Sequence, residues 1–516
     1  MLFNSGAFLF IFFPITLLFF YGLGRYNHRA AILFLAVASL VFYSIWDVRN
    51  LPIILSSITV CFYVSRRIQR LPSEMKAQRR RWMAVGIIFN LILLGTFKYA
   101  DFLSINLLGL FTDHPPAPHL WLPIGISFYT FTQIAYLVDA AEGKAKEPSL
   151  VNYLAFVSYF PHQISGPIFH HSEMMPQFNN PAIFHPSSRR IAAGLWLASI
   201  GLFKKVIIAD NLSVCAAAVF GYADHGHPLP FFSAWIGALA YTGQIYFDFS
   251  GYTDMALGIS TLLGIKMPIN FNSPYHSKSI IEFWRRWHMT LSRFLRDYLY
   301  IPLGGNRKGR VRRYVNLMVT MVLGGLWHGA GWTFLMWGTL HGIYLCINHA
   351  WRYLTEQSKL VLLCPEWLRN FSAWAATFLS VVVAWVFFRA KTFAGAFVVL
   401  KGMAGLTGIA WPPYFGPHVA QYLPTIVNGE NWLGPITDIF IPALMVLVLF
   451  ASFALPNSQA ILRGLGTSLN GDKNYDNGWF NPSRIPLYVW ALFFGLICGA
   501  GLAMMGGLSE FLYFNF

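Results

Sequence analysis

The amino-acid sequence predicts an all-α protein that crosses a membrane many times. Of its 516 residues, 56% are hydrophobic and only 11% are charged, whereas roughly 25% of residues in ordinary soluble domains carry a charge. Apolar runs near the ~20 residues that cross a bilayer as a helix recur along the chain. The alternating segments of about 10 residues that mark a membrane barrel are not seen. We expect a polytopic helical fold organised as one domain over residues 1–516.

The apolar runs fall into two groups. Those near the spanning length are 6–24, 30–46, 83–99, 192–218, 232–264, 315–335, 371–389, 436–455 and 485–507. Shorter or proline-interrupted pieces are 51–64, 101–111, 121–138, 150–168, 335–350 and 393–410. Together they predict roughly eleven spans. Some of the short pieces would be re-entrant, which is tolerated only where protein or water covers the backbone.

The basic residues orient the chain. The N-terminal stretch lacks the basic segment and cleavage pattern of a signal peptide, so it is expected to remain as the first span. Arg25 and Arg29 follow this span, and a dense basic cluster follows the third span, between 66 and 81. The positive-inside rule makes both loops cytoplasmic and turns the N-terminus outward. The expected location is a bacterial inner membrane.

Most of the basic residues that give the net charge of +16 are expected at the cytoplasmic rim of the protein. Topology and attraction to anionic lipid headgroups account for it, and steering of an anionic acyl donor is a compatible alternative. Nucleic acid is not an expected partner, because the charge is scattered between spans. Five cysteines, most of them in apolar runs, suggest neither a disulfide framework nor a metal site. Motifs of zinc proteases, phosphate-binding loops and serine hydrolases are absent from the sequence.

Two histidines lie inside a stretch otherwise suited to lipid. His328 and His341 belong to GGLWHGAGWTFLMWGTLHG, residues 324–342. Ionisable groups at membrane depth are rare and usually line a cavity, so each one is a functional-site hypothesis. The alternative is a buried histidine whose ring is satisfied by a backbone carbonyl.

Polar residues also interrupt the apolar stretch GQIYFDFSGYTDMALG, which begins at 243. It contains Asp248, Ser250, Tyr252 and Asp254. The two aspartates are six positions apart, so on one helix they would point in different directions, and Gly251 between them would allow a break. One interpretation is a pair of structural carboxylates, each satisfied by an arginine or by backbone donors. The other is that they orient a catalytic histidine or line a substrate tunnel.

The segment 280–300 is predicted to be one amphipathic helix, capped by Ser279 and ending before Pro302. At about 100° per residue, one face carries Trp284, Trp287, Leu291, Leu295 and Tyr298, and the other carries Arg285, Arg286, Arg293, Arg296 and Asp297. Such a helix usually rests at a membrane interface. His288 lies toward its apolar side, which suggests that it faces an internal channel while the arginines contact headgroups or an anionic donor.

These stretches resemble one known family. The motifs that carry the likeness are LPIGISFYTFTQIAYLVD, PHQISGP, YFDFSGYTDMALG, EFWRRWHMTLSRFLRDYLYIPLGGN and GGLWHGAGWTFLMWGTLHG. They resemble the membrane-bound O-acyltransferase (MBOAT) family, and within it the alginate and other exopolysaccharide acetylation proteins of bacteria. The likeness spans most of the chain, with its core motifs at 122–342.

The resemblance implies a funnel-shaped helical fold around a central tunnel, with re-entrant and amphipathic helices. By this resemblance His328 is the catalytic residue and His288 is the second intramembrane histidine. The residues expected to line or support the tunnel are Asp248, Ser250, Tyr252, Asp254, Trp327, Arg285 and Arg286. The role of His341 is left open, with a structural role as one alternative.

The chemistry suits a histidine independently of the family. Acyl transfer from a thioester to a hydroxyl needs a base within hydrogen-bond reach, and the ordinary histidine pKa of about 6.5 suits that role at neutral pH. His328 is the expected base. His288, Asp248 or a backbone donor would position the donor or stabilise the oxyanion, and the sequence leaves this choice open. An acyl-imidazole on His328 is a less favoured alternative.

The C-terminal span at 485–507 is followed by the aromatic ending SEFLYFNF. The default interpretation is a set of interface aromatics, common where a helix leaves lipid. However, the ending resembles an aromatic motif of surface-polymer acylation systems, which teichoic acid D-alanylation carries on a separate small protein. By that resemblance, Tyr513 is an acyl relay.

The expected function is therefore acetyl transfer across the inner membrane for O-acetylation of an extracytoplasmic polysaccharide. Acetyl-CoA is the expected donor, with no bound cofactor or metal, and alginate is the favoured polymer. The expected partners are a periplasmic or membrane-anchored SGNH-type acetyltransferase, the polysaccharide acceptor system and membrane lipid. Cellulose, peptidoglycan, lipid and protein acceptors remain open. A non-enzymatic transporter would use the buried histidines for proton coupling.

Overall fold

The computed structural model describes residues 1–112, 117–357, 365–409, 447–448, 450, 452–453, 455–464, 487–505 and 511–512. Throughout these residues the regular elements are helices. The first half contains η1 (Phe8–Phe12), α1 (Phe13–Tyr26), α2 (His28–Ser44), α3 (Asn50–Arg70), α4 (Lys76–Leu94), η2 (Gly95–Tyr99), α5 (Ala100–Leu107), η3 (Leu108–Leu110), α6 (Ile126–Ala141), α7 (Leu150–Ser158), α8 (Phe160–Gln163), α9 (His171–Phe178) and η4 (Pro181–Phe184).

The second half begins with a long helix that has one wider turn in its middle. It contains α10 (Ser188–Phe203), η5 (Lys204–Ala209), α11 (Asp210–Asp224), α12 (Phe231–Leu262), η6 (Pro274–His276), α13 (Ile280–Arg286), α14 (Met289–Leu295), η7 (Arg296–Tyr300), α15 (Arg310–His328), α16 (Trp332–Gln357), α17 (Glu366–Arg389), α18 (Phe393–Met403), α21 (Ser458–Gly464) and α22 (Leu487–Ala503).

The polytopic prediction is confirmed by long apolar helices. Within the described residues, five helical segments are long and apolar enough to cross a membrane: Phe8–Tyr26, Asn50–Arg70, Lys76–Leu110, Ser188–Asp224 and Glu366–Arg389. Shorter apolar helices are His28–Ser44, Phe393–Met403 and Val489–Ala503. The predicted total of about eleven spans stays a prediction. Most of the run expected at 436–455 lies outside the described residues.

One predicted span is wrong in its bounds. The run 315–335 is not a single helix, because α15 ends at His328 and α16 begins at Trp332. Gly329 leaves the helical conformation with φ −165° and ψ 150°. Glycines disfavour helix interiors because they lose more backbone freedom than other residues. The break places His328 at the tip of a helical hairpin.

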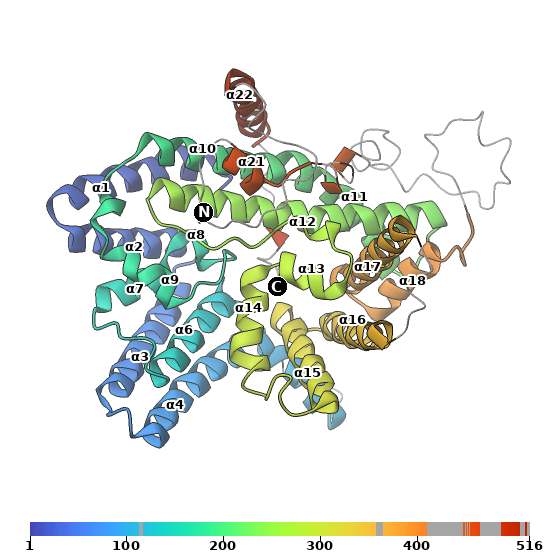
Figure 1. Cartoon of the computed structure of the whole chain (residues 1–516), viewed down its shortest axis with the longest axis horizontal. Coiled ribbons are helices and arrows are strands. Elements are labelled where there is room, and N and C mark those ends of the chain that lie inside the picture. Colours follow the sequence, from blue (N-terminus) through green and yellow to red (C-terminus); the bar gives the residue numbers. More distant parts are fainter. Residues whose placement is uncertain are drawn as a thin grey trace.

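Helix α12 is the central element of the molecule (Figure 1). It is one unbroken helix in which 27 of 32 residues are buried. The buried hydrophobic residues form two clusters, and α12 passes from one cluster to the other between Phe249 and Tyr252. In Figure 1, α1–α4 and α6–α9 lie toward one end of α12, and α15–α18 lie toward the other end. The polar stretch of α12 therefore lies at the junction of the two halves.

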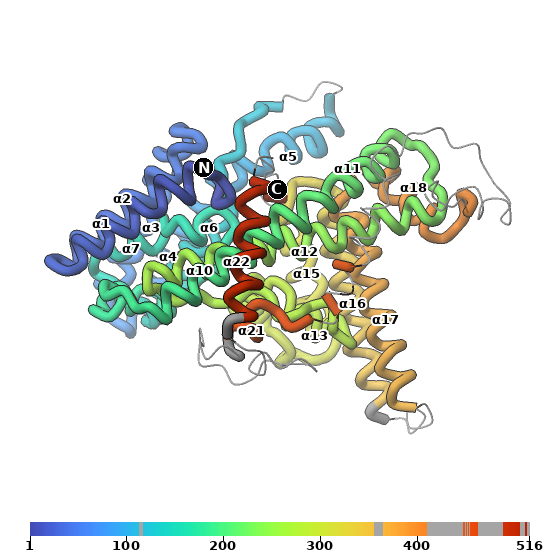
Figure 2. The backbone as a smooth tube through the Cα atoms, turned by 90° about the horizontal axis from the view of Figure 1, so that it is seen from above, coloured from blue at the N-terminus to red at the C-terminus, as the bar shows by residue number. Residues whose placement is uncertain are grey.

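The helix break that Gly251 would allow is not found, because α12 continues through this residue. A Cβ atom at Gly251 would lie 2.8 Å from the Gly201 carbonyl oxygen and 3.2 Å from the Lys205 nitrogen. Small residues let membrane helices approach closely. Gly251 therefore serves contact between α12 and the helix formed by α10 and η5. Helix α22 packs across the outer face of α10 (Figure 2).

Candidate active site

The hairpin of α15 and α16 carries both histidines of the 324–342 stretch. A Cβ atom at Gly325 would lie 2.3 Å from the Phe334 carbonyl oxygen, and one at Gly338 would lie 2.4 Å from that of Met321. These glycines allow the two backbones to touch. His328, the last residue of α15, is buried with 3% of its surface exposed.

A lysine and a tyrosine from another element bond the end of α15. Lys98 Nζ donates to the Trp327 carbonyl oxygen at 2.5 Å, to Ser127 Oγ at 3.1 Å and, more weakly, to the His328 carbonyl oxygen at 3.4 Å. Tyr99 donates its hydroxyl to the Leu326 carbonyl oxygen at 2.7 Å. The last carbonyls of a helix have no partner within the helix. Lys98 and Tyr99, from the wider turn η2, supply these partners and fix the backbone that carries His328.

Imidazole and indole rings alternate in a row through the site. The ring centroids of His288, Trp327, His328, Trp337 and His341 follow one another at 6.3, 4.9, 5.0 and 4.8 Å. We call these five residues the ring row. All three imidazoles of the row are buried. The structure thus brings His328 together with His288, on either side of Trp327.

The neighbours of the ring row are mostly aromatic. Phe388 of α17 packs edge-on against His328 at 5.1 Å, and Phe249 of α12 packs edge-on against His288 at 4.7 Å. Lys98, His288 and His341 lie close enough to act electrostatically on His328. Trp284 donates its indole N–H to His341 Nδ1 at 3.3 Å. That bond satisfies one side of the His341 ring.

The predicted helix 280–300 is wrong in its continuity. It is divided into α13, α14 and η7, with a break at Trp287 and His288. His288 is in the left-handed region, with φ 41° and ψ 55°. A residue other than glycine there is strained by about 1–2 kcal/mol, and such strain gathers at functional sites.

Asn270 stabilises the break at His288. Its backbone carbonyl oxygen accepts the Met289 N–H at 3.0 Å, and its side-chain oxygen accepts the Thr290 hydroxyl at 2.6 Å and faces His288 Nδ1 at 3.4 Å. The helical pattern of the sequence runs unbroken through these positions, so nothing local in it marks the turn. The turn directs His288 inward.

The two faces predicted for this segment are found despite the break. Trp284, Trp287, Leu291 and Leu295 are buried. Arg285 is exposed. Arg286 is half-buried, and its guanidinium forms an ion pair with the Glu282 carboxylate at an N–O distance of 2.9 Å. The structure therefore places Arg285 and Arg286 away from the ring row, whereas Trp327 stands within it.

The two aspartates of α12 pair with consecutive lysines of η5. Asp248 Oδ1 accepts from Lys205 Nζ at 2.7 Å, and Lys205 also reaches Asp210 at 2.8 Å. Asp254 Oδ2 accepts from Lys204 at 2.6 Å and from the Ser458 hydroxyl at 2.7 Å. The carboxylates point in different directions, as predicted for one helix. Their cationic partners are lysines where the structural interpretation expected arginines, and the backbone donor that it offered as the alternative is found at Asp248, which accepts the Leu512 N–H at 3.0 Å.

The remaining predicted residues near α12 are buried but lie outside the ring row. Tyr252 stacks on Phe3 at 5.0 Å and meets Phe511 edge-on at 4.8 Å. Ser250 is buried with 2% exposure. Tyr513 lies outside the described residues. The two residues before it, Phe511 and Leu512, are described and lie against α12.

Sequence reasoning missed Lys98, Lys204, Lys205 and Asn270. A usable signal was present for the lysines, because all three stand within or beside apolar runs near 83–111 and 192–218. An ionisable residue in such a run marks a functional or structural site by the same argument that selected His328. Asn270 had no such signal, since its partners are 18 and more positions away.

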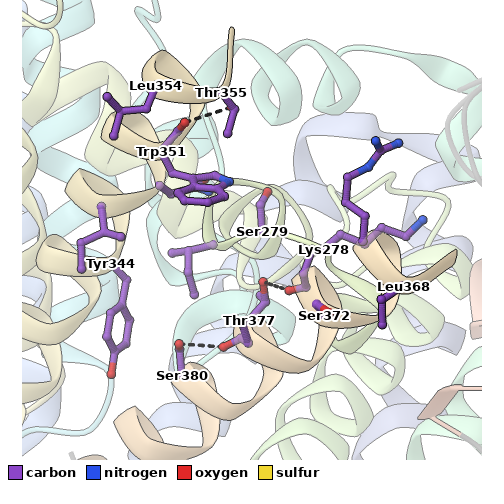
Figure 3. Close-up of a pocket in the computed structure, with 16 residues that line it drawn as sticks. Lys278, Ser279, Tyr344, Trp351, Leu354, Thr355, Leu368, Ser372, Thr377 and Ser380 are labelled. Atoms are coloured by element: carbon purple, nitrogen blue, oxygen red, sulfur yellow. Dashed lines mark hydrogen bonds between the residues drawn. The ribbon is translucent and has the colours of Figure 1, made fainter. Parts of the chain in front are cut away.

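A cavity of about 950 Å³ lies between α16, α17 and the start of α13 (Figure 3). The hydroxyls of Thr355, Thr377 and Ser380 donate to carbonyl oxygens of their own helices. Its cationic side chains are Lys278 and Arg369. The ring of Tyr344, which lines the cavity, lies 5.9 Å from the His341 ring at the end of the ring row. Among the residues described, no group of three or more acidic, histidine or cysteine side chains is placed to hold a metal ion.

Comparison with known proteins finds relatives whose names describe acyl transfer. The chain is 43% identical to the peptidoglycan O-acetyltransferase of Helicobacter pylori, over 100% of this chain and 98% of the relative. It is 42% identical to the probable alginate O-acetylase of Pseudomonas aeruginosa, over 78% of this chain and 75% of the relative. A teichoic acid D-alanyltransferase of Streptococcus thermophilus is 31% identical over 44% of this chain and 57% of the relative.

The family match covers the elements that build the ring row. Residues 51–388 match the MBOAT, membrane-bound O-acyltransferase family. This range begins with α3 and ends in α17, and it includes Lys98, α12 and the hairpin of α15 and α16. The chain is therefore an acyltransferase that belongs to the membrane-bound O-acyltransferase family.

Proposed function

We propose that this protein moves an acetyl group from a cytoplasmic thioester, acetyl-CoA, to Tyr513 of its own C-terminus, for O-acetylation of a polysaccharide outside the inner membrane. The observation that carries the proposal is the ring row, with His328 at the tip of α15 inside a family of acyltransferases. A buried imidazole beside a fixed helix end is a suitable general base.

With His328 as the base, every proton and bond of the transfer is accounted for. His328 takes the proton of the acceptor hydroxyl while the hydroxyl oxygen attacks the thioester carbonyl carbon. The tetrahedral intermediate collapses as the C–S bond breaks, and the proton passes from His328 to the thiolate that leaves. The products are an acetyl ester and a free thiol. A phenol, with a pKa of about 10, needs such a base to attack at neutral pH.

The cavity in Figure 3 supports a thioester donor. Lys278 and Arg369 are suited to the phosphates of a CoA, and the wall beyond them is formed mainly by apolar side chains. Because Tyr344 connects this wall with His341, a donor held there would extend toward the ring row. We propose this cavity as the entrance of the donor, on the cytoplasmic side set by the basic loops.

The orientation and location follow the basic residues. Arg25 and Arg29 stand at the junction of α1 and α2, and another basic cluster is formed by the end of α3 and the start of α4. Both would face the cytoplasm, so the N-terminus would face outward. Acceptance on the outer side then requires a second transferase, and we propose an SGNH-type acetyltransferase as the partner.

Two polymers are candidates for the final acceptor. The peptidoglycan O-acetyltransferase aligns along the whole chain, including the region beyond α18, whereas the alginate O-acetylases align over 76–78% of it. This full-length likeness supports peptidoglycan as the first polymer to test and leaves alginate, favoured by the sequence motifs, as the second. Measurement of ester-bound acetate in both polymers, with and without the gene, discriminates between them.

The reaction is tested with the full chain in liposomes. Labelled acetyl-CoA is supplied on one face at a time, and label on the C-terminal peptide is followed by mass spectrometry. We expect labelling by the wild type, a decrease of about 10²–10⁴-fold in His328→Ala, and no label in Tyr513→Phe. Arg285→Ala, exposed on α13 and away from the ring row, is the control and retains transfer.

Two results would contradict the proposal. Equal labelling of wild type and His328→Ala would remove His328 from the reaction. Transfer to an added SGNH-type partner by Tyr513→Phe at the wild-type rate would eliminate the relay and leave direct transfer.

A further inference from the structure

We propose that Lys205, Asp210 and Asp248 form a buried latch that holds the chain's own C-terminal segment at Phe511 and Leu512. The latch deepens the proposed function and rests on it, because the residue that follows Leu512 is the proposed relay, Tyr513. Lys205 and Asp248 are then positioning residues for the acceptor of the acetyl group.

The first observation is how Asp248 divides its two oxygens. Oδ1 accepts from Lys205 Nζ at 2.7 Å, and Oδ2 accepts the backbone N–H of Leu512 at 3.0 Å. Asp248 and Lys205 are buried, with 2% and 1% exposure. A buried carboxylate is stable only when its oxygens are paired. A backbone donor from a residue 264 positions away therefore completes the environment of this carboxylate.

The second observation concerns Phe511. Lys205 Nζ lies 4.7 Å from the centroid of its ring, within the range of a cation–π interaction. The same ring meets Tyr252 of α12 edge-on at 4.8 Å. Phe511 is 1% exposed. At this residue, the interface-belt interpretation of the aromatic ending is wrong, because the ring is enclosed between a buried cation and α12.

The third observation links the latch to the chemistry. Asp248 and Phe249 are consecutive on α12, and while Asp248 binds the Leu512 N–H, Phe249 packs against the His288 ring at 4.7 Å. One turn of one helix thus contacts both the end of the ring row and the C-terminal segment. Holding an acceptor beside a base is worth several orders of magnitude in rate. The latch secures the chain one residue before the proposed acceptor.

The neighbouring ion pair provides a matched control. Lys204 and Asp254 come from the same two elements, but Asp254 bonds Ser458 and Gln459 of α21. This pair makes no described contact with Phe511 or Leu512. A variant of Asp254 therefore disturbs a buried carboxylate of α12 without removing a bond to the C-terminal segment.

The experiment measures hydrogen–deuterium exchange of the C-terminal peptide in the full-length protein in liposomes. Leu512→Pro removes the N–H that Asp248 accepts and leaves the membrane core unchanged, whereas Leu512→Ala shortens the side chain and keeps the donor. We expect exchange of the peptide to rise on the order of tenfold to a hundredfold in Leu512→Pro and in Asp248→Ala, the range of one hydrogen bond to a charged group. Leu512→Ala and Asp254→Asn stay near wild type.

A second measurement, acetylation of the C-terminal peptide, separates positioning from mere anchoring. We expect kcat to fall about tenfold in Leu512→Pro while the KM for acetyl-CoA is unchanged, because the donor site is intact. Unchanged exchange in both Leu512→Pro and Asp248→Ala would overturn the latch. Faster exchange with an unchanged kcat would overturn its positioning role. Wild-type exchange in Tyr513→Phe, together with normal transfer to the partner, would leave the latch standing and defeat the proposed relay instead.

Discussion

Two buried polar regions lie along α12, and they differ in the kind of side chain that surrounds their polar groups. The ring row surrounds three imidazoles with indole and phenyl rings, and Lys98 is the cation that acts on His328. The lysines of η5 instead face carboxylates directly, at 2.6 to 2.8 Å. A side chain held by fixed ionic partners is suited to positioning. A side chain among uncharged rings can still bind and release a proton, which is what acyl transfer requires.

Lys204→Met is expected to give the largest loss of stability. It leaves Asp254 without its cation, and breaking a buried ion pair costs about 3–5 kcal/mol. The Ser458 and Gln459 donors keep the loss near the lower end. Unfolding in detergent by denaturant or heat measures it. The folded fraction should retain wild-type kcat, since the pair does not contact the ring row.

The double variant Lys204→Met with Asp254→Leu is the control for that prediction. Removing both charges eliminates the unpaired carboxylate, so part of the stability should return. A single variant as stable as the wild type would show that the ion pair does not stabilise the fold. A normal stability with a large loss of kcat would instead assign Lys204 to the chemistry.

Lys98→Met is expected to lower kcat strongly, in contrast to Lys204→Met, which lowers the stability and retains kcat. It removes the donor to the Trp327 and His328 carbonyl oxygens, so the end of α15 can shift. Displacement of a catalytic group by about 1 Å can cost roughly 10²-fold in rate. We expect kcat to fall on that order with little change in KM, as measured by labelling of the C-terminal peptide.

Tyr99→Phe and Lys98→Arg sharpen this prediction. Tyr99→Phe removes one bond to the Leu326 carbonyl oxygen, one residue farther from His328, and should cost less. Lys98→Arg keeps a cationic donor and should restore part of the rate. Should Lys98→Met and Tyr99→Phe lower stability equally and leave kcat intact, η2 would be a structural cap only.

A smaller effect is expected at the cavity. Lys278→Glu reverses one charge at the proposed entrance of the donor, and Lys278 is not a member of the ring row. A rim charge at a partly solvated site is worth about 1 kcal/mol, so the KM for acetyl-CoA should rise several-fold with kcat unchanged. Arg285→Glu, exposed on α13 and not a lining residue of this cavity, is the matched control. An equal KM for both variants and the wild type would remove the cavity from the donor path.

The comparison also shows what the sequence can and cannot predict. The helical class follows from composition, and the burial of His328 and His341 follows from their place in apolar runs. The left-handed turn at His288 could not be read, because it depends on Asn270, which is distant in the chain. The pairing of Lys205 with Asp248 and of Asp248 with Leu512 likewise joins segments that only the tertiary fold brings together. Periodicity describes one element at a time, whereas these contacts belong to several.

A third ion pair lies outside the membrane-spanning helices, and its loss is expected to have the smallest effect on stability. Glu173 of α9 accepts two bonds from the Arg293 guanidinium of α14, at 2.5 and 2.7 Å, with side chains 34% and 28% exposed. Burial opposes ionisation of Glu173, but the bonds from Arg293 outweigh it and hold the pKa of this carboxyl below its ordinary value. A carboxyl with a lowered pKa stabilises the fold above its unfolded-state pKa, and this stability is lost as the pH falls through the folded-state value.

Glu173→Gln should therefore lower the unfolding temperature slightly at neutral pH. The loss corresponds to less than about 1 kcal/mol, because solvent screens a pair this exposed. The difference from wild type should narrow as the pH decreases from about 6 to about 3, where the wild-type carboxyl also becomes neutral. Arg296→Gln should change the unfolding temperature even less, because the Arg296 side chain is 62% exposed and pairs with its sequence neighbour Asp297. A difference that widens in acid would mean that protonated Glu173 is the stabilising form, and the direction of its pKa shift would be reversed.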